Sequence, residues 1–268
     1  MASMRDTKGP RQSGGRQGKQ ALILIIAGSL CLGAAFLTAA ILLSSCSASV
    51  SSAIQADGGA RISIQAEVPA SLAAKFRQLA ATGSSSSPTG PFFDAAAIRK
   101  SIAARPALSI IELSQPGPDS IRAELSARSL EELAASPDLK GSGLFTITRG
   151  TGWTEFRFRL ERGGVKALTA LFPGIDPYLL EALSPPALEE DPVTVAEYKT
   201  MLKSILGDKA MPAMDAAAVT LSLSAPGLVL GSGGGSLSGS TLTAKIPIIE
   251  ALTLEKPIEL WLRWKSDK

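Results

Sequence analysis

The chain has 268 residues, of which 45% are hydrophobic and 19% are charged, a composition typical of a folded protein rather than a disordered one. It contains no histidine, which excludes a Ser-His-Asp or Cys-His nucleophile and any metal site that needs imidazole. Residues 1–20 carry five basic side chains and one acidic one, so the net charge of +3 leaves −1 for the rest of the chain. Nucleic acids are bound by clustered Lys and Arg side chains. Because the chain after residue 20 is close to neutral, we expect no nucleic-acid partner.

Residues 21–43 form an uninterrupted apolar segment that follows the basic residues 1–20. Its 23 residues meet the roughly 20 that a helix needs to cross a bilayer. Basic residues on the amino-terminal side keep that end in the cytoplasm. The pattern predicts a membrane-targeting leader, with the body of the chain exported to the cell envelope.

The segment Leu43-Ser44-Ser45-Cys46 resembles a bacterial lipobox, in which an apolar residue and two small residues precede the cysteine. The resemblance implies cleavage after a signal peptide of residues 1–45 and diacylation of the Cys46 sulfur, for example with palmitate. Each buried methylene of an acyl chain contributes about 0.8 kcal/mol to membrane binding. The alternative is an uncleaved signal anchor over residues 21–43. Both interpretations attach the body to the membrane, outside the cytoplasm.

Residues 46–60 are rich in Ser, Ala and Gly and hold almost no large apolar side chain. Such a segment cannot bury enough surface to order itself, so we predict a flexible tether here. Residues 61–268 are then a single extracytoplasmic domain. The second cysteine, Cys31, lies in the leader, so a disulfide framework is not expected in this domain.

Apolar residues alternate with polar ones in many short segments of this domain, as in half-buried strands. The predicted strands are 61–68, 108–113, 121–127, 144–148, 153–161, 219–223, 242–246 and 258–265. Turn residues at 115–119 and 149–152 predict two hairpins.

Helical spacing of apolar residues predicts helices between these strands. The predicted helices are 70–79, 94–104, 129–135, 165–172, 177–183 and 194–207. Ser129 with Glu132, and Thr194 with Glu197, have the spacing of a capping box. Hairpins interspersed with helices indicate an α+β fold, with a mainly antiparallel sheet built of hairpins and helices packed on one face.

Two segments have the composition of a ligand site but not its spacing. The run 231–236 is glycine-rich like a phosphate-binding loop, but no Gly-Lys-Ser or Gly-Lys-Thr follows it, and we predict a flexible hairpin loop. Glu189, Glu190 and Asp191 are adjacent rather than alternating as in a calcium loop, and we predict a solvated helix entry. We therefore expect no metal, no cofactor and no catalytic activity.

Trp261 and Trp264 lie on opposite faces of the last predicted strand. Trp264 shares its face with apolar residues, and we expect it in the core. Three alternatives stay open for Trp261: it packs under a helix, it is exposed, or it forms an aromatic platform for a glycan or a lipid headgroup.

The last fifth of the chain, 219–265, resembles the LppM-type lipoprotein domain. The resemblance lies in Ala225-Pro226-Gly227, the glycine-rich hairpin, Lys245-Ile246-Pro247-Ile248, Leu252-Thr253-Leu254 and Pro257. It implies a membrane-tethered α/β domain that binds lipid or glycolipid without enzymatic activity, and it assigns no functional residue.

We therefore expect a bacterial lipoprotein whose non-catalytic domain binds a lipid, a glycolipid or an envelope partner. The alternative is a structural or accessory subunit of a cell-envelope assembly, held by an uncleaved anchor. A lipid-binding domain should enclose an apolar cavity, whereas an accessory subunit should expose an apolar patch.

Overall fold

The structure is a computed structural model that describes residues 47–83, 90–137, 139–162, 183, 185–188 and 193–266. The chain separates into two units, residues 1–44 and residues 45–268, and every described residue belongs to the second unit. Several predicted segments therefore lie outside the described residues: the leader, the lipobox, the helix 165–172, all but one residue of the helix 177–183, and Glu189-Glu190-Asp191. Within the described ranges, no helix is long and apolar enough to cross a bilayer.

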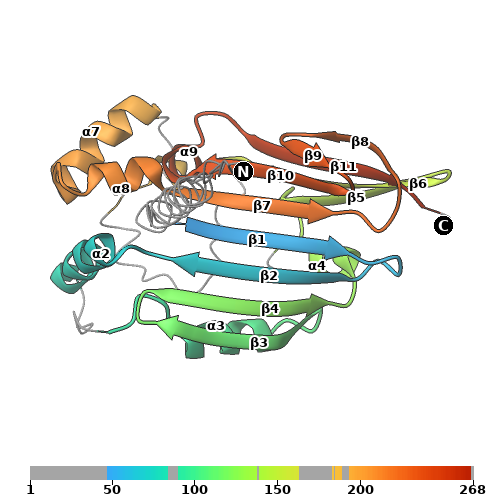
Figure 1. The fold of residues 1–268 in the computed structure, drawn as a ribbon, viewed down its shortest axis with the longest axis horizontal. Helices are drawn as coiled ribbons and strands as arrows, with labels where there is room; N and C mark the ends of the chain where they lie inside the picture. Colours follow the sequence, from blue (N-terminus) through green and yellow to red (C-terminus); the bar gives the residue numbers. More distant parts are fainter. Residues whose placement is uncertain are drawn as a thin grey trace, which may run out of the picture. The chain divides into compact units, whose positions relative to one another are not determined.

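Seven strands form the larger sheet, which we call sheet A (Figure 1). In spatial order they are β3 (Leu108–Gly117), β4 (Ser120–Ala127), β2 (Ala60–Glu67), β1 (Ser47–Ile54), β7 (Ala218–Ser224), β10 (Thr241–Pro247) and β9 (Ser236–Ser238). Neighbouring strands are antiparallel except β1 and β7, which are parallel. The two predicted strands at 108–113 and 121–127 pair as the predicted hairpin, although β3 extends four residues further.

Four antiparallel strands form the smaller sheet, sheet B. In spatial order they are β5 (Phe145–Gly150), β6 (Trp153–Leu160), β11 (Ile258–Lys265) and β8 (Val229–Gly233). Apolar side chains of both sheets share one buried cluster, which includes Ile54 and Leu242 from sheet A and Phe156 and Leu262 from sheet B. Sheet B therefore covers part of one face of sheet A.

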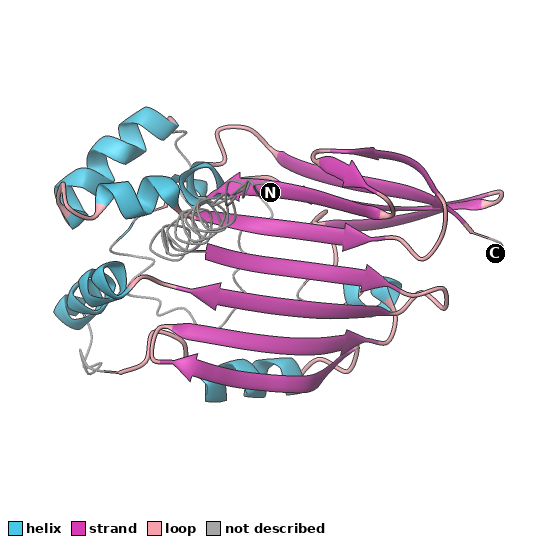
Figure 2. Cartoon of the chain, viewed as in Figure 1, coloured by secondary structure: helices cyan, strands magenta, loops and turns pink. Residues whose placement is uncertain are grey.

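Four helices gather at one end of sheet A, where β2 and β10 end and β7 begins (Figure 2). They are α2 (Ala70–Gly83), α7 (Val195–Leu206), α8 (Met211–Ala216) and α9 (Ile248–Thr253). We call this group the helical end. A second buried cluster holds it together, with Leu72, Tyr198 and Leu202 fully buried. The Tyr198 hydroxyl donates a hydrogen bond of 3.0 Å to the Leu183 carbonyl, and burial raises the pKa of this hydroxyl above its ordinary value.

Three further elements complete the described fold: α3 (Ala95–Ala103), α4 (Leu130–Ala134) and the 3-10 helix η2 (Pro186–Leu188). Ile102 of α3 packs with Ala123 and Leu125 of β4 in a third buried cluster, while Leu130 and Leu133 of α4 join the cluster between the sheets. Both helices thus lie on the face of sheet A that also meets sheet B.

The helix starts behave largely as their sequences predict. Thr194 and Glu197 form the complete capping box of α7, and Gly207 follows its last residue. Of the capping box predicted at α4, the structure shows one half, in which the Ser129 hydroxyl accepts a hydrogen bond of 3.2 Å from the Glu132 amide. These side chains bind amides that have no partner within the first helical turn.

The α+β fold with mainly antiparallel pairing is confirmed, although the strands divide between two sheets. The tether expected at 46–60 is wrong for most of its length. Residues 47–54 form β1, which pairs with β2 from Ser47↔Glu67 to Ile54↔Ala60 and with β7 from Ser47↔Ala218 onward. Small side chains bury little surface, but backbone hydrogen bonds on both sides hold this strand in the middle of the sheet.

The flexible loop expected at 231–236 is also wrong. This segment includes the end of β8 and the start of β9, joined by a tight turn at Gly234 and Gly235. Gly234 has a φ of 84°, and a Cβ at this position would lie 1.9 Å from the Glu259 carbonyl oxygen. Glycine is required here because the chain turns tightly against β11.

Candidate ligand-binding face of sheet B

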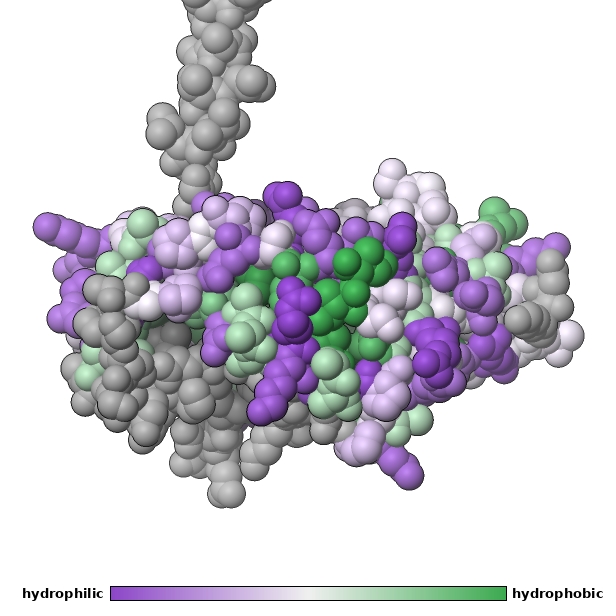
Figure 3. All heavy atoms as spheres, turned by 90° about the horizontal axis from the view of Figure 1, so that it is seen from below, coloured by the Kyte–Doolittle hydropathy of each residue, from purple (hydrophilic) through white to green (hydrophobic). Residues whose placement is uncertain are grey.

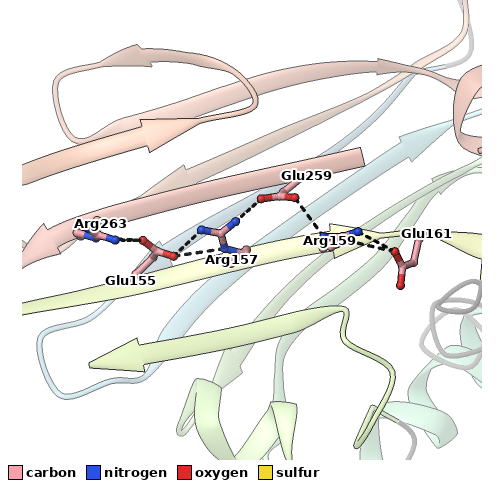
Figure 4. Close-up of polar contacts among 6 residues, drawn as sticks. All are labelled: Glu155, Arg157, Arg159, Glu161, Glu259 and Arg263. Atoms are coloured by element: carbon pink, nitrogen blue, oxygen red, sulfur yellow. Dashed lines mark hydrogen bonds and ion pairs between the residues drawn. The ribbon is translucent and has the colours of Figure 1, made fainter. Parts of the chain in front are cut away.

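The two central strands of sheet B, β6 and β11, turn their charged side chains and two tryptophans, Trp153 and Trp261, away from the core. Successive strand residues point to opposite sides, so the alternating sequences of both strands place polar groups on one face. Figure 4 shows the charged ones, which lie in a row across the two strands. We call this surface the outer face; its side chains are Trp153, Glu155, Arg157, Arg159, Glu259, Trp261 and Arg263.

Glu155 lies near one end of the charged row, between Arg263 and Arg157 (Figure 4), and is 6% exposed. Its carboxylate accepts hydrogen bonds from Arg157 Nη2 at 2.9 Å and from Arg263 Nη2 at 2.7 Å. Burial acts to raise the pKa of Glu155, but the hydrogen bonds and positive charges of the two arginines outweigh it and hold the pKa below its ordinary value. Glu155 is therefore ionised at neutral pH.

The row continues toward the other end of β6. Arg157 pairs with Glu259 as well as with Glu155, Arg159 Nη1 lies 3.8 Å from Glu259, and Arg159 Nη2 lies 3.1 Å from Glu161. The hydrogen bond to Glu155 raises the pKa of Arg157. Three arginines are thus balanced by three carboxylates, so the row offers directed donors and acceptors rather than excess positive charge for a phosphate.

Trp261 leans from β11 over two glycines of β8. A Cβ at Gly233 would lie 2.3 Å from the indole Nε1 of Trp261, and one at Gly231 would lie 3.2 Å from carbons of the ring. On the other side, the guanidinium carbon of Arg157 lies 5.9 Å from the centre of the ring. The glycines therefore leave the space in which the Trp261 ring lies across the strand.

Trp153 repeats this arrangement at the start of β6. A Cβ at Gly150, its partner on β5, would lie 2.2 Å from the Trp153 ring. The guanidinium carbon of Arg263 lies 4.3 Å from the centre of the same ring, within the range of a cation–π contact. Each half-buried indole thus has a glycine beneath it and an arginine over its ring, and the two arginines share the Glu155 carboxylate.

The structure shows where the two predicted aromatic residues of the last strand lie. Trp264 is 5% exposed and belongs to the core, as expected. Trp261 packs over the glycines of β8. Sequence reasoning missed the contribution of Trp153 and Gly150, although the polar alternation of 153–161 was visible. The missing information was the pairing of β6 with β11, which lie about a hundred residues apart in the chain.

Large apolar side chains are also exposed outside this face. Leu228, which precedes β8, is 69% exposed, and Leu230 of β8 is 52% exposed; β8 is one of the two edge strands of sheet B. A separate apolar patch gathers over β3 and α3 (Figure 3), where Ile111 is 48% exposed beside the partly buried Ile98 and Ile110. Patches of this kind often mark contact sites for other molecules.

The predicted lipidation site, Cys46 with Leu43, Ser44 and Ser45, lies outside the described residues, and its acylation stays a prediction. The described structure begins at the next residue, Ser47, which is already the first residue of β1.

Comparison with known proteins gives one distant structural similarity. No family model matches the sequence, and no curated protein matches it. The chain is similar to the folded domain of the Mycobacterium tuberculosis protein LppM, solved by NMR, with a TM-score of 0.40 and 12% sequence identity. This similarity covers 83% of the present chain and 91% of the LppM chain. It is therefore not confined to the last fifth of the chain, where the sequence resemblance was placed.

Proposed function

We propose that this chain is a membrane-anchored bacterial lipoprotein, held by a diacylated Cys46, whose non-catalytic domain binds carbohydrate of the cell envelope on the outer face of sheet B. The carbohydrate is either free or the headgroup of a glycolipid. One observation carries the choice of ligand: Trp153 and Trp261 lie over glycines, and each ring has over it an arginine that pairs with Glu155.

The chemistry of this face suits a sugar. A sugar ring has apolar C–H groups on its faces and hydroxyl groups at its edge, which match an aromatic ring flanked by donors and acceptors. Acyl chains are less suited, because the apolar side chains of β6 and β11, such as Phe156 and Leu262, are buried in the core. A binding role also fits Glu155, whose lowered pKa makes it a poor proton donor at neutral pH.

The ligand can be tested with the full-length lipoprotein extracted in detergent. The two probes are a water-soluble polysaccharide extract of the producing cells and a glycolipid extract of the same cells in phosphatidylcholine vesicles. Losing one stacking ring by Trp261→Ala should weaken binding roughly tenfold, or about 1.4 kcal/mol. Ile111→Ala, on the separate exposed patch, is the control. Binding of both extracts that is unaffected by Trp261→Ala and Trp153→Ala would exclude this face.

The anchor has its own test, the intact mass of protein extracted from membranes. We expect the mass of residues 46–268 plus acyl chains, and we expect Cys46→Ala to lose the acyl mass. Cys31→Ala is the matched control, because this cysteine lies within the segment that cleavage removes. A full-length mass without acyl groups would instead identify the uncleaved signal anchor.

One observation favours a second candidate, an accessory subunit of an envelope protein assembly. Leu228 and Leu230 are exposed at the edge of the sheet that carries the Trp and Arg side chains, and Trp and Arg are common at the centres of protein interfaces. Leu228→Asp should then reduce recovery of a cross-linked partner protein while leaving carbohydrate binding intact. Unchanged cross-linking would remove this candidate.

A further inference from the structure

The absence of a tether between Cys46 and the folded domain restricts how the domain can sit on a membrane. We propose that the helical end of sheet A lies against the lipid bilayer, and that the Trp153 end of the outer face points away from it. This inference rests on the proposed lipidation of Cys46.

The position of β1 follows from its pairing on both sides. Ser47, the residue after Cys46, is paired with Glu67 of β2 and with Ala218 of β7. Cys46 immediately precedes Ser47 in the sequence, so a single peptide bond separates the acylated residue from the paired end of β1. Acyl chains attached to its sulfur must enter the bilayer, and this end of the sheet must therefore lie at the level of the lipid headgroups.

The helical end is the part of the domain next to this point. α2 begins three residues after Glu67, and α8 ends two residues before Ala218. Figure 1 shows α2, α7 and α8 extending beyond the ends of the strands on this side. Helices that extend past the anchored strand will meet the headgroups before any other described part of the domain does.

The exposed side chains nearest to the start of β1 are compatible with a headgroup layer. Those in the first turn of α2 and on α8 are mostly small or uncharged: Ala70, Ser71, Pro212 and Ala216. Two charged side chains also lie here: Asp215, which is paired with Lys199 at 2.7 Å, and the exposed Glu67, the partner of Ser47 on β2. The headgroup layer is polar, so neither charge has to enter the hydrocarbon core of the bilayer.

The other end of β1 leads to the distal surface. β1 has eight residues, and a strand rises about 3.3 Å per residue, which gives about 25 Å between its two ends. The turn after β1 lies next to Arg149 of β5, since a Cβ at Gly58 would be 3.6 Å from Nη2 of this arginine. Arg149 is adjacent to Gly150, over which Trp153 lies. Trp153 is therefore well above the membrane and suited to a glycan that projects from it.

Two matched cysteine variants test the orientation. Ala216 and Ala56 are both exposed alanines, the first two residues before Ala218 and the second two residues after β1. Each is changed to Cys in the full-length lipoprotein, labelled with a fluorophore, and incorporated into vesicles of phosphatidylcholine and phosphatidylglycerol that contain a headgroup-linked spin label. We expect several-fold stronger quenching at residue 216 than at residue 56. Equal quenching, or stronger quenching at residue 56, would overturn the proposal.

A spacer variant and a mass measurement complete the test. Twelve Gly and Ser residues inserted between Cys46 and Ser47 should remove the difference in quenching while leaving the domain folded; a difference that persists would show that the short connection does not set the orientation. Intact mass is measured on the same vesicles. A protein without acyl groups would contradict the proposed anchor, whereas an acylated protein with equal quenching would contradict the orientation alone.

Discussion

β1 and β11 are both inner strands with a neighbour on each side, but they are stabilised differently. β11 alternates large side chains, with Leu260, Leu262 and Trp264 all 5% exposed or less. β1 reads SASVSSAI, and its small side chains are mostly half-buried or exposed. The free energy that holds β11 in place comes largely from apolar burial, whereas β1 depends on backbone pairing with β2 and β7.

This difference explains why one strand is visible in the sequence and the other is not. Alternation of large apolar and polar residues indicates a strand because it reports burial of one face. A strand of Ser and Ala gives almost no such signal and has the composition of a linker. A segment of small residues next to a membrane anchor can therefore be the centre of a sheet.

The largest expected effect comes from breaking the pairing of β1. Ser51 is exposed and paired with Ser63 on one side and with Ser222 on the other. Ser51→Pro removes a backbone donor and places a ring between the two neighbours, which should cost at least about 3 kcal/mol. We expect loss of a cooperative unfolding transition, measured by circular dichroism during heating.

Ser51→Thr is the control for this variant, because it keeps the backbone donor and adds a side chain that strands favour. Its free energy of unfolding should stay within about 0.5 kcal/mol of the parent protein. A tether would tolerate proline as readily as threonine, so a fully folded Ser51→Pro protein would contradict the role of β1.

Truncating a side chain should affect the two strands unequally. Leu262 of β11 is 0% exposed, and Leu262→Ala should lower the free energy of unfolding by about 3 kcal/mol through lost burial and a cavity. Val50 of β1 is half-buried, and Val50→Ala should cost about 1 kcal/mol. Urea unfolding measures the loss of unfolding free energy in both variants. Equal losses would show that the two strands are stabilised alike.

Much of the fold was predictable where the local signal was strong. β2, β6 and β11 were visible from alternation, α7 from its capping box and its closing glycine, and the β3–β4 hairpin from its turn residues. The division into two sheets was not predictable, because it depends on pairings such as β6 with β11 between distant segments. The segment 231–236 was misjudged because its glycines are needed for close packing under Trp261 and against β11, not for flexibility.

The candidate site was predictable in part. The sequence placed Trp261 opposite Trp264 and predicted an alternating strand at 153–161, but the partners of the polar groups come from other strands. Glu155 gave no signal of its own, since an acidic residue in an amphipathic strand is ordinarily solvated. Its burial is visible once β11 brings Arg263 beside it.

Glu155 should make the stability of sheet B depend on pH. Its pKa is lower in the folded protein than the ordinary value of 4.5, so its stabilising contribution is present above that pH and is lost as the pH falls through the folded pKa. Glu155→Gln removes a charged acceptor from two arginines and should cost about 2 kcal/mol at pH 7. Urea unfolding between pH 7 and pH 3 should show a weaker loss with falling pH in this variant than in the parent.

The control for Glu155→Gln is Glu132→Gln, an exposed carboxylate on α4 whose ion pair with Arg128 spans 4.0 Å at the surface. An exposed pair at this distance contributes little, so its pH profile should follow that of the parent protein. If the Glu155 variant and the parent protein had identical pH profiles, the negative charge of Glu155 would not contribute to the free energy of unfolding.

The smallest expected effect concerns the glycines under Trp261. Gly233→Ala places a methyl group where the indole Nε1 now lies, so the ring must move, at a cost of about 1 kcal/mol. The indole N–H signal in an NMR spectrum, assigned by its loss in Trp261→Phe, should shift in Gly233→Ala and not in Ser236→Ala, an exposed position on β9. Because the proposed carbohydrate contact needs the ring in its present place, Gly233→Ala should also weaken binding. A shifted signal with unchanged binding would mean that Trp261 stabilises sheet B without contacting a ligand.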